Sequence, residues 1–396
     1  MNMKSERAKI ALVRAGAYKC DELSIDIDEA LDLIGGLSSF VPPQSKVFVK
    51  INHLPPPSVA EKCIVTNPVF VEAVVTLLKA ITTDITVGDD IDSGPPDGFE
   101  VSGIRQACDR AGVKLINLRE EGFIEKSDAN NMALDKTYIS KAVLESDVII
   151  NLPKMKTHSL AVFTGAVKNM YGVLPGGIRR RYHADYMARV DFNQMLVDVF
   201  SQVRPHLNIM DGIMAMEGEG PAGGSPRKVG VVLAGADAVA LDAVATTIIG
   251  IDPMDVRTLK YAAQRGLGVA DLGSIDVVGQ AIDDVKVLGF KHPASSSGAA
   301  VEKAPRFLAG FVVKQLDVKP SVKKVKCTGC AECAKVCPVH AIKMSSKIAK
   351  INDSMCIKCL CCHEVCRYDA IVRRQSFGGR LLAFLGKTMQ RAFNKS

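Results

Sequence analysis

Short runs of β-branched and other apolar residues alternate with stretches of helical periodicity from residue 8 to about residue 285. This alternation is typical of an α/β fold with a mostly parallel sheet and flanking helices. Eight strands are predicted, at Ile10–Arg14, Lys46–Ile51, Asp84–Gly88, Lys114–Asn117, Asp147–Leu152, Leu207–Met210, Gly230–Ala234 and Ile275–Val278. Helices predicted between them include Pro68–Ile81, Lys141–Glu145, Phe192–Val203 and Ala238–Ile249. Eight strands exceed one small α/β unit, so the pattern fits either one large sheet or two linked lobes.

The pattern changes near residue 290, where residues 292–300 are small and polar and have the composition of a linker. We predict an α/β domain at residues 1–290, a linker at 291–320, a small α+β module at 321–372 and a tail at 373–396. The module is internally duplicated, because the pair Ala341-Ile342 after its first cysteine run is echoed by Ala370-Ile371 after its second.

Two cysteine runs of the same spacing dominate the small module. They are Cys327-x2-Cys330-x2-Cys333-x3-Cys337-Pro338 and Cys356-x2-Cys359-x2-Cys362-x3-Cys366. Runs of this kind bind 4Fe-4S clusters, and in two-cluster ferredoxins the fourth cysteine of each run ligates the other cluster. We therefore predict two 4Fe-4S clusters, one bound by Cys327, Cys330, Cys333 and Cys366, and the other by Cys356, Cys359, Cys362 and Cys337.

Other uses of these cysteines fit less well. Structural zinc takes its ligands as two pairs, which does not suit a tight run of four followed by proline. A disulfide framework belongs to secreted proteins, and the N-terminal segment, with charges on both sides of a short apolar run, does not resemble a signal peptide. Cys361 is predicted to be a bystander, because only Cys362 restores the spacing of the first run.

Composition and charge favour a cytoplasmic protein that does not bind nucleic acid. No apolar stretch reaches the length of a membrane span. The formal net charge is +7, but seven basic residues and one acidic residue lie between Arg367 and the C-terminus, so the rest of the chain is nearly neutral. A general nucleic-acid-binding surface is therefore not expected on the α/β domain.

The C-terminal tail has helical order from Arg380 to Phe393, with a basic face opposite an apolar one. Such a helix suits peripheral contact with an anionic membrane surface. Since Phe384 lies on the charged side and Gly386 weakens the helix, we favour the alternative that its apolar face packs on this protein or on another subunit.

Polar residues follow four of the predicted strands, at the sheet edge where α/β proteins bind ligands. They are Lys50, Asn52 and His53; Asp89, Asp90 and Asp92; Asn151, Lys154, Lys156, Thr157 and His158; and Asp211, Glu217 and Glu219. Any one of these groups is unremarkable at a strand end. Four of them together predict an active cleft.

The segment from Asn151 to His158 is the densest of these groups. Lysines two apart on an extended chain point to the same side, so Lys154 and Lys156 are expected to hold one anionic group, with His158 as a proton donor. Further on, a glycine-rich stretch leads into Arg179, Arg180 and Arg181, which suits a phosphate or carboxylate ligand. The alternative for this stretch is a solvated surface loop.

Several common catalytic motifs are missing from the sequence. There is no GxxxxGK[ST] phosphate loop, no GxGxxG after the first strand and no GxSxG nucleophile elbow. A flavin or another organic cofactor stays open, because flavin binding has no single obligatory motif.

The α/β part resembles the family called domain of unknown function 362, whose members are often joined to a C-terminal ferredoxin. The stretches that carry the resemblance span residues 45 to 280: Thr66-Asn67-Pro68, Val87-Gly88-Asp89, Asn151 to His158, Thr164 to Gly172, Asp211 to Gly224 and Ala240 to Ala243. The resemblance implies an α/β domain with an iron-sulfur association and no settled reaction. The small module is similar to bacterial two-cluster ferredoxins, with Arg367 where a proline is usual.

Together these observations predict an iron-sulfur oxidoreductase that passes electrons between a carrier protein and an anionic substrate or cofactor in the cleft. The alternative is a non-catalytic carrier or adaptor that docks a ferredoxin module on a larger redox complex, and whether the chain is an enzyme stays open. The catalytic candidates are Lys154, Lys156, His158, Lys168, His183, Asp211 and Glu217, and the ligand-binding candidates are Asn67, Asp89, Asn169, Arg179 and Arg180.

Overall fold

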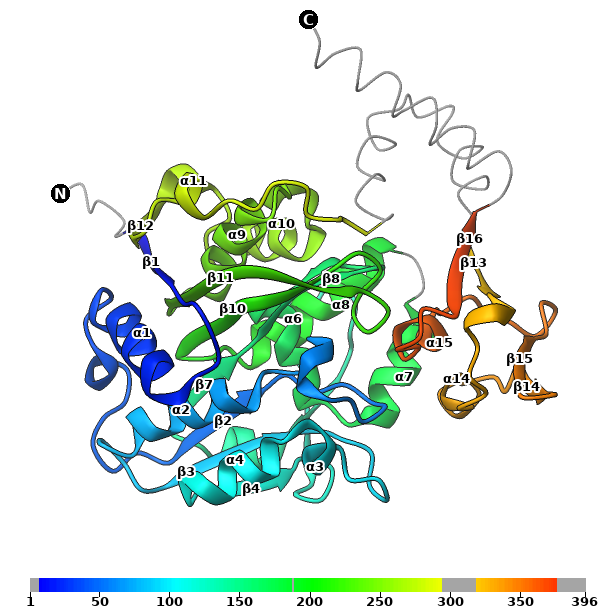
Figure 1. Cartoon of the computed structure of the whole chain (residues 1–396), viewed down its shortest axis with the longest axis horizontal. Coiled ribbons are helices and arrows are strands. Elements are labelled where there is room, and N and C mark those ends of the chain that lie inside the picture. Colours follow the sequence, from blue (N-terminus) through cyan, green and yellow to red (C-terminus); the bar gives the residue numbers. More distant parts are fainter. Residues whose placement is uncertain (1–6, 187–188, 294–317, 376–396) are drawn as a thin grey trace, which may run out of the picture.

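The computed structural model describes residues 7–186, 189–293 and 318–375, which form one large α/β domain and a small module beside it (Figure 1). Most of the predicted linker and the basic amphipathic tail beyond Gln375 lie outside the described residues. Within the described ranges, no helix is both long enough and apolar enough to cross a bilayer.

A single ten-stranded sheet organises the α/β domain, which settles the choice between one sheet and two lobes. Eight strands follow the order β12-β1-β11-β10-β7-β2-β3-β4, and β8 and β9 attach beside β10. Most neighbouring pairs are parallel, and β11 runs antiparallel to both β1 and β10. The bounds are β1 (Ala8–Arg14), β2 (Val47–Ile51), β3 (Ile85–Asp89), β4 (Lys114–Asn117), β7 (Val148–Leu152), β8 (Lys154–His158), β9 (Val162–Thr164), β10 (Leu207–Glu217), β11 (Ser225–Gly235) and β12 (Ile275–Gly279).

All eight predicted strands are therefore present, and two of them are longer than expected. Strands β10 and β11 pair as an antiparallel ribbon that continues past the edge of the neighbouring strands. Strand β8 extends this edge by pairing with β10, and it carries the Lys154–His158 segment. A separate hairpin, β5 (Phe123–Lys126) and β6 (Thr137–Ser140), lies off the main sheet.

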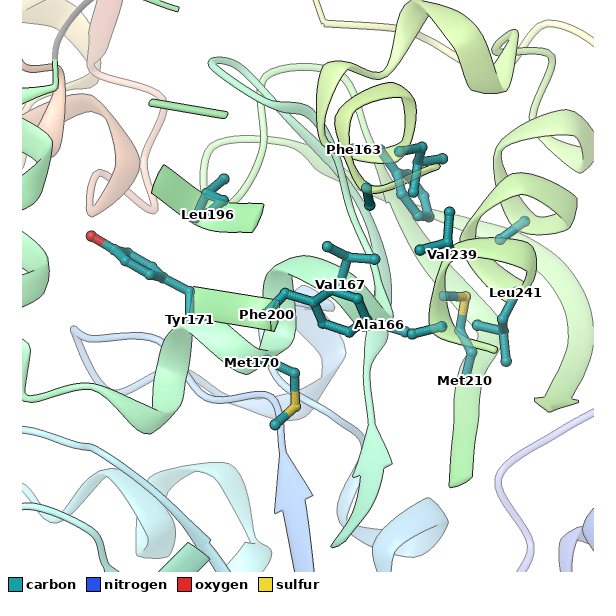
Figure 2. Packing of buried hydrophobic residues seen from close by; sticks show 14 of the residues in the cluster. Phe163, Ala166, Val167, Met170, Tyr171, Leu196, Phe200, Met210, Val239 and Leu241 are labelled. Carbon is teal, nitrogen blue, oxygen red and sulfur yellow. The ribbon is translucent and has the colours of Figure 1, made fainter. Parts of the chain in front are cut away.

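Helices cover both faces of the sheet because its strands bury alternate residues on opposite sides. In β1, Ile10 and Leu12 contact one core, whereas Ala11 and Val13 contact the other. The second core is closed by α1 (Cys20–Asp32), α2 (Pro68–Leu78), α3 (Gly98–Ser102) and α4 (Ile104–Ala111). The first is closed by α6 (Ala166–Asn169), α8 (Arg189–Gln202), α9 (Ala238–Ile248) and α10 (Arg257–Gln264), and Figure 2 shows residues of its packing.

The short helix α6 is fixed by a carboxylate from α9. Asp242 accepts hydrogen bonds from the backbone N–H of Ala166 at 2.6 Å and of Val167 at 3.0 Å. Burial raises the pKa of Asp242 to about 7. A Cβ atom on Gly165 would lie 2.0 Å from Oδ1 of Asp242, so glycine is required before the helix. This arrangement positions Lys168, which lies on α6 and faces the candidate site described below.

The glycine-rich stretch, for which a solvated surface loop was the alternative, leads instead into the helix α7 (Gly176–Asp185). Two further short helices, α5 (Lys141–Leu144) and α11 (Ile282–Val285), complete the α/β domain. Because α7 is a helix, Arg179 and Arg180 are held by regular backbone rather than by a mobile loop.

The small module has the pseudo-symmetry that its duplicated sequence predicts. Its elements are β13 (Val318–Val322), α14 (Glu332–Lys335), β14 (Ile342–Ser345), β15 (Ile348–Ile351), α15 (Cys361–Glu364) and β16 (Ile371–Gln375), with β13 paired to β16 and β14 to β15. Positive φ angles recur 29 residues apart, at Ala331 and Leu360 and at His340 and Asp369. Strand β13 begins at Val318, three residues before the predicted start of the module.

Candidate functional site

A cavity of about 120 Å³ lies where the carboxyl ends of β2, β3 and β8 meet α6, α7 and the small module. Figure 1 shows α7 and α15 side by side at this junction. The α/β domain contributes Lys50, Asn52, His53, Asp89, Asp92, Arg119, Lys156, Thr164, Lys168, Asn169, Tyr171, Arg179, Arg180 and His183, among others. The module contributes Val336, Cys361, Glu364 and Val365. A cavity therefore lies at the sheet edge where the cleft was predicted, and its wall includes residues of the α/β domain and of the module.

Lys50 and Asp89 form a buried ion pair on the floor of the cavity. Nζ of Lys50 lies 2.7 Å from Oδ2 of Asp89, and neither side chain is more than 1% exposed. Asp89 also accepts a hydrogen bond from the backbone N–H of His53. A Cβ atom on Gly172 would lie 2.6 Å from Nζ of Lys50, so glycine makes room for the pair.

Lys156 and Lys168 differ from Lys50, because no ion pair with a carboxylate is formed by either within the described residues. Nζ of Lys156 donates to the carbonyl oxygen of Ile64, and Nζ of Lys168 lies 5.8 Å from the ring centroid of Tyr171. Burial, followed by the charges of Lys168 and Lys154, lowers the pKa of Lys156 well below its usual value. Burial also lowers the pKa of Lys168, while Glu364 acts in the opposite direction. An anionic ligand would compensate both ammonium groups.

Arg119 and Arg179 are held at the cavity by aspartates that follow β3. Nε of Arg119 donates to Asp90 at 3.0 Å and its Nη1 to Asp92 at 3.0 Å. Nη2 of Arg179 donates to the backbone oxygen of Asp90 at 3.0 Å and lies 3.1 Å from its carboxylate. These two guanidinium groups are therefore paired with aspartates, whereas Lys156, Lys168 and Arg180 form no ion pair with a carboxylate among the described residues.

Two histidines of the α/β domain face Glu364 of the module. Nε2 of His158 lies 3.3 Å from Oε1 of Glu364, and Nε2 of His183 lies 3.5 Å from Oε2. Nδ1 of His158 accepts hydrogen bonds from the backbone N–H groups of Leu160 and Ala161, so its proton is on Nε2 and points at Glu364. Burial lowers the pKa of both histidines, that of His183 to about 3. Both rings are thus neutral.

The cavity also contains polar atoms that are buried without a hydrogen-bond partner among the described residues. They include Oδ1 of Asn52, Nδ1 of His53, Oγ1 of Thr164 and Nδ1 of His183. Buried polar atoms are nearly always satisfied in native proteins. Their concentration at one cavity indicates a place for a polar ligand.

Lys154 and Asp211 are not part of this cavity. Nζ of Lys154 lies 2.7 Å from Oδ2 of Asp211 and 2.7 Å from the hydroxyl of Tyr18, which itself donates to Oδ1 of Asp211 at 2.7 Å. Lys154, Asp211 and Tyr18 therefore all have hydrogen-bond partners within this cluster. The structure therefore separates Lys154 from Lys156, which were expected to hold one anion together.

Two further candidates also lie outside the cavity. Glu217 accepts a hydrogen bond from the backbone N–H of Lys291 at 3.0 Å. Asn67 caps α2, since its side chain accepts from the backbone N–H of Val69 and its own N–H donates to Asp211. The candidates that the structure does bring to the cavity are Asp89, Lys156, Lys168, Asn169, Arg179, Arg180 and His183, with His158 behind Glu364.

Four cysteines surround a second, smaller cavity inside the module, together with apolar side chains. They are Cys337, Cys356, Cys359 and Cys362, the set predicted to bind one cluster across the duplication. Backbone N–H groups of Ala341 and Lys358 donate to the sulfurs of Cys337 and Cys356. The donor set and the enclosed space therefore fit an iron-sulfur cluster.

The other predicted set, Cys327, Cys330, Cys333 and Cys366, is also brought together. Burial, followed by the charges of Cys330, Cys366 and Cys327, raises the pKa of the Cys333 thiol to about 11. Ionised thiolates packed in this way repel one another, and bound iron would compensate their charge. In the described ranges, no three His, Cys, Asp or Glu side chains are grouped so as to hold a single metal ion.

The two domains are connected by hydrogen bonds around this junction. Guanidinium groups of the module donate to backbone oxygens of the α/β domain, Arg367 to Pro57 and Arg373 to Ser159. Gly223 packs against the backbone of the module, since a Cβ atom there would lie 3.4 Å from the carbonyl oxygen of Cys366. The glycine-rich loop from Gly218 to Gly224 is thus part of the interface.

Sequence reasoning did not single out Arg119, Glu364 or Cys361 as site residues. Arg119 lies two residues after β4 and would have been found by extending the strand-end argument to that strand. Glu364 occupies the position equivalent to Lys335 in the first half of the duplication. This reversal of charge between the two halves is the feature of the sequence that could have identified Glu364 as a site residue. Cys361, predicted to be a bystander, lines the cavity.

A family model described as a domain of unknown function, DUF362, matches residues 47–247. The chain belongs to the DUF362 family. A second model, described as a 4Fe-4S dicluster domain, matches residues 319–367. The expected combination of a DUF362 domain with a ferredoxin module is therefore confirmed. The match to the 4Fe-4S dicluster model supports an iron-sulfur electron-transfer role for this DUF362 protein.

Three similar proteins illustrate the two parts of the chain. A thylakoid-associated protein of Synechocystis is 34% identical over 262 residues, which cover 66% of this chain and 79% of that protein. One component of an ion-translocating oxidoreductase complex from Methanosarcina acetivorans is 39% identical over 61 residues, 15% of this chain and 23% of that component. The lactate racemase apoprotein of Thermoanaerobacterium thermosaccharolyticum aligns with a TM-score of 0.39 and 9% identity over 59% of this chain and 54% of that one.

Proposed function

We propose that this DUF362 protein is an iron-sulfur oxidoreductase whose clusters exchange electrons with a small anionic ligand bound in the shared cavity. The observation that carries the proposal is that helix α15, which bears Cys362 and is flanked by Cys359 and Cys366, also forms a wall of that cavity. A ligand there would lie against the segment that binds the clusters.

The charge of the cavity defines the class of ligand. Lys156 and Lys168 are buried and lack carboxylate partners among the described residues, so they favour a carboxylate or phosphate group. Asn52 and Thr164 add unsatisfied polar atoms that suit further oxygen substituents. A cavity of about 120 Å³ suits a small molecule rather than a polymer.

Chemically, the clusters would supply or accept one electron at a time when bound. The side chains of the cavity bind the ligand, compensate its charge and exclude water, while His158 and His183 lie against Glu364 and fix its position. Each electron gained by the ligand is one given up by an external carrier, so the two half-reactions balance.

The experiment uses protein purified without air. Its clusters are reduced with dithionite, excess reductant is removed, and a panel of small carboxylates and phosphates is added while the visible absorbance of the clusters is followed. We expect at least one compound to reoxidise the clusters, and Lys156→Met or Lys168→Met to lower its kcat/KM by about 100-fold, since charged hydrogen bonds contribute roughly 1.5–3 kcal/mol each. Lys114→Met, on the exposed edge strand β4, is the matched control.

If the experiment fails, the alternative function is that of a non-catalytic adaptor for a larger redox complex. In that case no compound reoxidises the clusters, no small anion is released when the purified protein is denatured, and both lysine variants behave as the control does. Equal behaviour of all three variants toward every compound would therefore refute a ligand-binding role for the cavity.

A further inference from the structure

The positive charge of this protein is concentrated on its small module. Residues 319–375 contain nine lysines and three arginines against four acidic residues, a net charge of +8, while the whole chain carries +7. A charge density of this kind attracts molecules of the opposite sign over distances of about 10 Å at moderate salt. The location of these lysines decides what they would attract.

The hairpin of β14 and β15 places two lysines directly opposite each other. Lys343 pairs with Lys350 in the antiparallel register, and both side chains are exposed. Like charges in this position destabilise a hairpin. The neighbouring cross-strand pair, Ile342 and Ile351, faces the other way and lines the cavity that contains Cys337, Cys356, Cys359 and Cys362. The lysine pair is therefore one layer of side chains from a cluster site.

The turn of the same hairpin covers the second group of cysteines. The carbonyl oxygen of Lys347 lies 3.9 Å from Sγ of Cys327, and Cys330 in that group is exposed. We call Lys343, Lys347 and Lys350, which lie on this hairpin and are all exposed, the lysine face.

The lysine face is open and its charges are not compensated. None of its three lysines forms an ion pair within residues 7–186, 189–293 and 318–375, in contrast to Lys326, which lies 2.6 Å from Asp369. Figure 1 shows the hairpin on the side of the module that points away from the α/β domain. The cavity of the proposed function is thus on one side of the cysteine groups and the lysine face on the other.

We propose that the lysine face is the docking surface for a small electron-carrier protein with an acidic face. Docking there brings the carrier to both cysteine groups, since the hairpin lines the cavity of one group and its turn lies against Cys327 of the other. One electron leaves the reduced carrier and one is accepted by the module, and the reverse holds for the opposite direction of flow. Solvated lysines without a partner are the competing explanation, but they give no reason for a like-charged cross-strand pair over a cluster site.

Binding of an acidic ferredoxin tests the proposal without relying on turnover. A fluorescently labelled, oxidised acidic ferredoxin is titrated with the full chain at several salt concentrations, and Kd is measured by anisotropy. We expect Lys343→Glu/Lys350→Glu to weaken binding at least tenfold and to reduce its dependence on salt. The matched control is Lys9→Glu/Lys114→Glu, which reverses two exposed lysines on the α/β domain.

The single variant Lys343→Glu separates docking from folding. It replaces a like-charged cross-strand pair by an oppositely charged one, so the melting temperature should stay the same or rise while binding weakens. A fall in affinity with no loss of thermal stability supports docking. An affinity equal to wild type in both variants, or equally reduced in the control, would overturn the proposal.

The proposal rests on the electron-transfer role of the module and not on the chemistry of the cavity. Reoxidation of dithionite-reduced clusters by small anions should be unchanged in Lys343→Glu/Lys350→Glu. If that reaction is absent but the ferredoxin still binds through the lysine face, the cavity proposal fails and the docking proposal stands.

Discussion

Oε1 of Glu364 lies 3.3 Å from Nε2 of His158, which connects the cluster-binding module to the end of the central sheet. The carboxylate also faces His183 and is buried beside Lys168. A module side chain therefore contributes an acidic group to a cavity formed mainly by the α/β domain.

Replacing Glu364 by lysine is expected to separate the two domains. A lysine there would be buried beside Lys168 without compensation, and burying an unpaired charge costs several kcal/mol. The cysteines lie within the module, so cluster content should not change. Small-angle scattering should show a larger radius of gyration for Glu364→Lys. Asp353→Lys, at an exposed position after β15, makes the same charge change and should leave the radius as in wild type. An unchanged radius for both variants would contradict this prediction.

Removing the Lys154 side chain is expected to lower the stability of the fold and not to act directly on the reaction in the cavity. Lys154→Met leaves Asp211 buried without its cation, which should lower the free energy of unfolding by about 3–5 kcal/mol. Lys154→Met/Asp211→Asn should recover part of this loss because no charge is then left uncompensated. Urea denaturation of the full chain measures both effects. If Lys154→Met is as stable as wild type but inactive, Lys154 acts in the reaction instead.

Acid conditions should destabilise the protein partly through His183. Burial, followed by the charges of Lys168 and Arg179, lowers the pKa of His183 from 6.5 to about 3. Between these values the unfolded ring takes up a proton and the native ring does not. The corresponding stability is complete above pH 6.5 and is lost as the pH falls toward 3.

His183→Gln should therefore reduce the slope of the unfolding free energy against pH, and only between pH 6.5 and 3. The reduction corresponds to at most one proton taken up on unfolding. Denaturant titrations at several pH values measure the slope. His340→Gln is the control because His340 is exposed. A slope identical to wild type between pH 6.5 and 3 would show that His183 is not held neutral in the native state.

Two glycines close together in the chain should respond in opposite ways to alanine. At Gly165 a Cβ atom would lie 2.0 Å from Oδ1 of Asp242, so Gly165→Ala should cost about 3 kcal/mol or more by displacing the cap of α6. At Gly177 nothing lies within 4 Å of the added atom, so Gly177→Ala should stay within about 1 kcal/mol of wild type. Thermal melts compare them directly. Similar melting temperatures for the two variants would mean that Asp242 moves aside at little cost.

The eight sheet strands were predictable because apolar periodicity reflects burial on two faces of a strand. The added strand β8 was not predicted, since Lys154, Lys156 and His158 alternate with only one apolar residue, Met155. Polar side chains are buried there because Asp211 pairs with Lys154, the carbonyl oxygen of Ile64 accepts from Lys156, and Glu364 lies 3.3 Å from His158. Those partners are distant in the chain, so local pattern could not reveal them.

By itself the sequence determined the class of fold, the duplicated module and the grouping of cysteines, because each depends on spacing along a short segment of chain. Only the tertiary structure decided which strand-end residues share a cavity. Lys154 and Lys156 are two residues apart, yet Lys154 is neutralised by Asp211 whereas Lys156 faces the cavity without a carboxylate. The physical reason is that the charge state of a buried side chain is set by what packs against it, and those neighbours come from segments up to about 200 residues away in the chain.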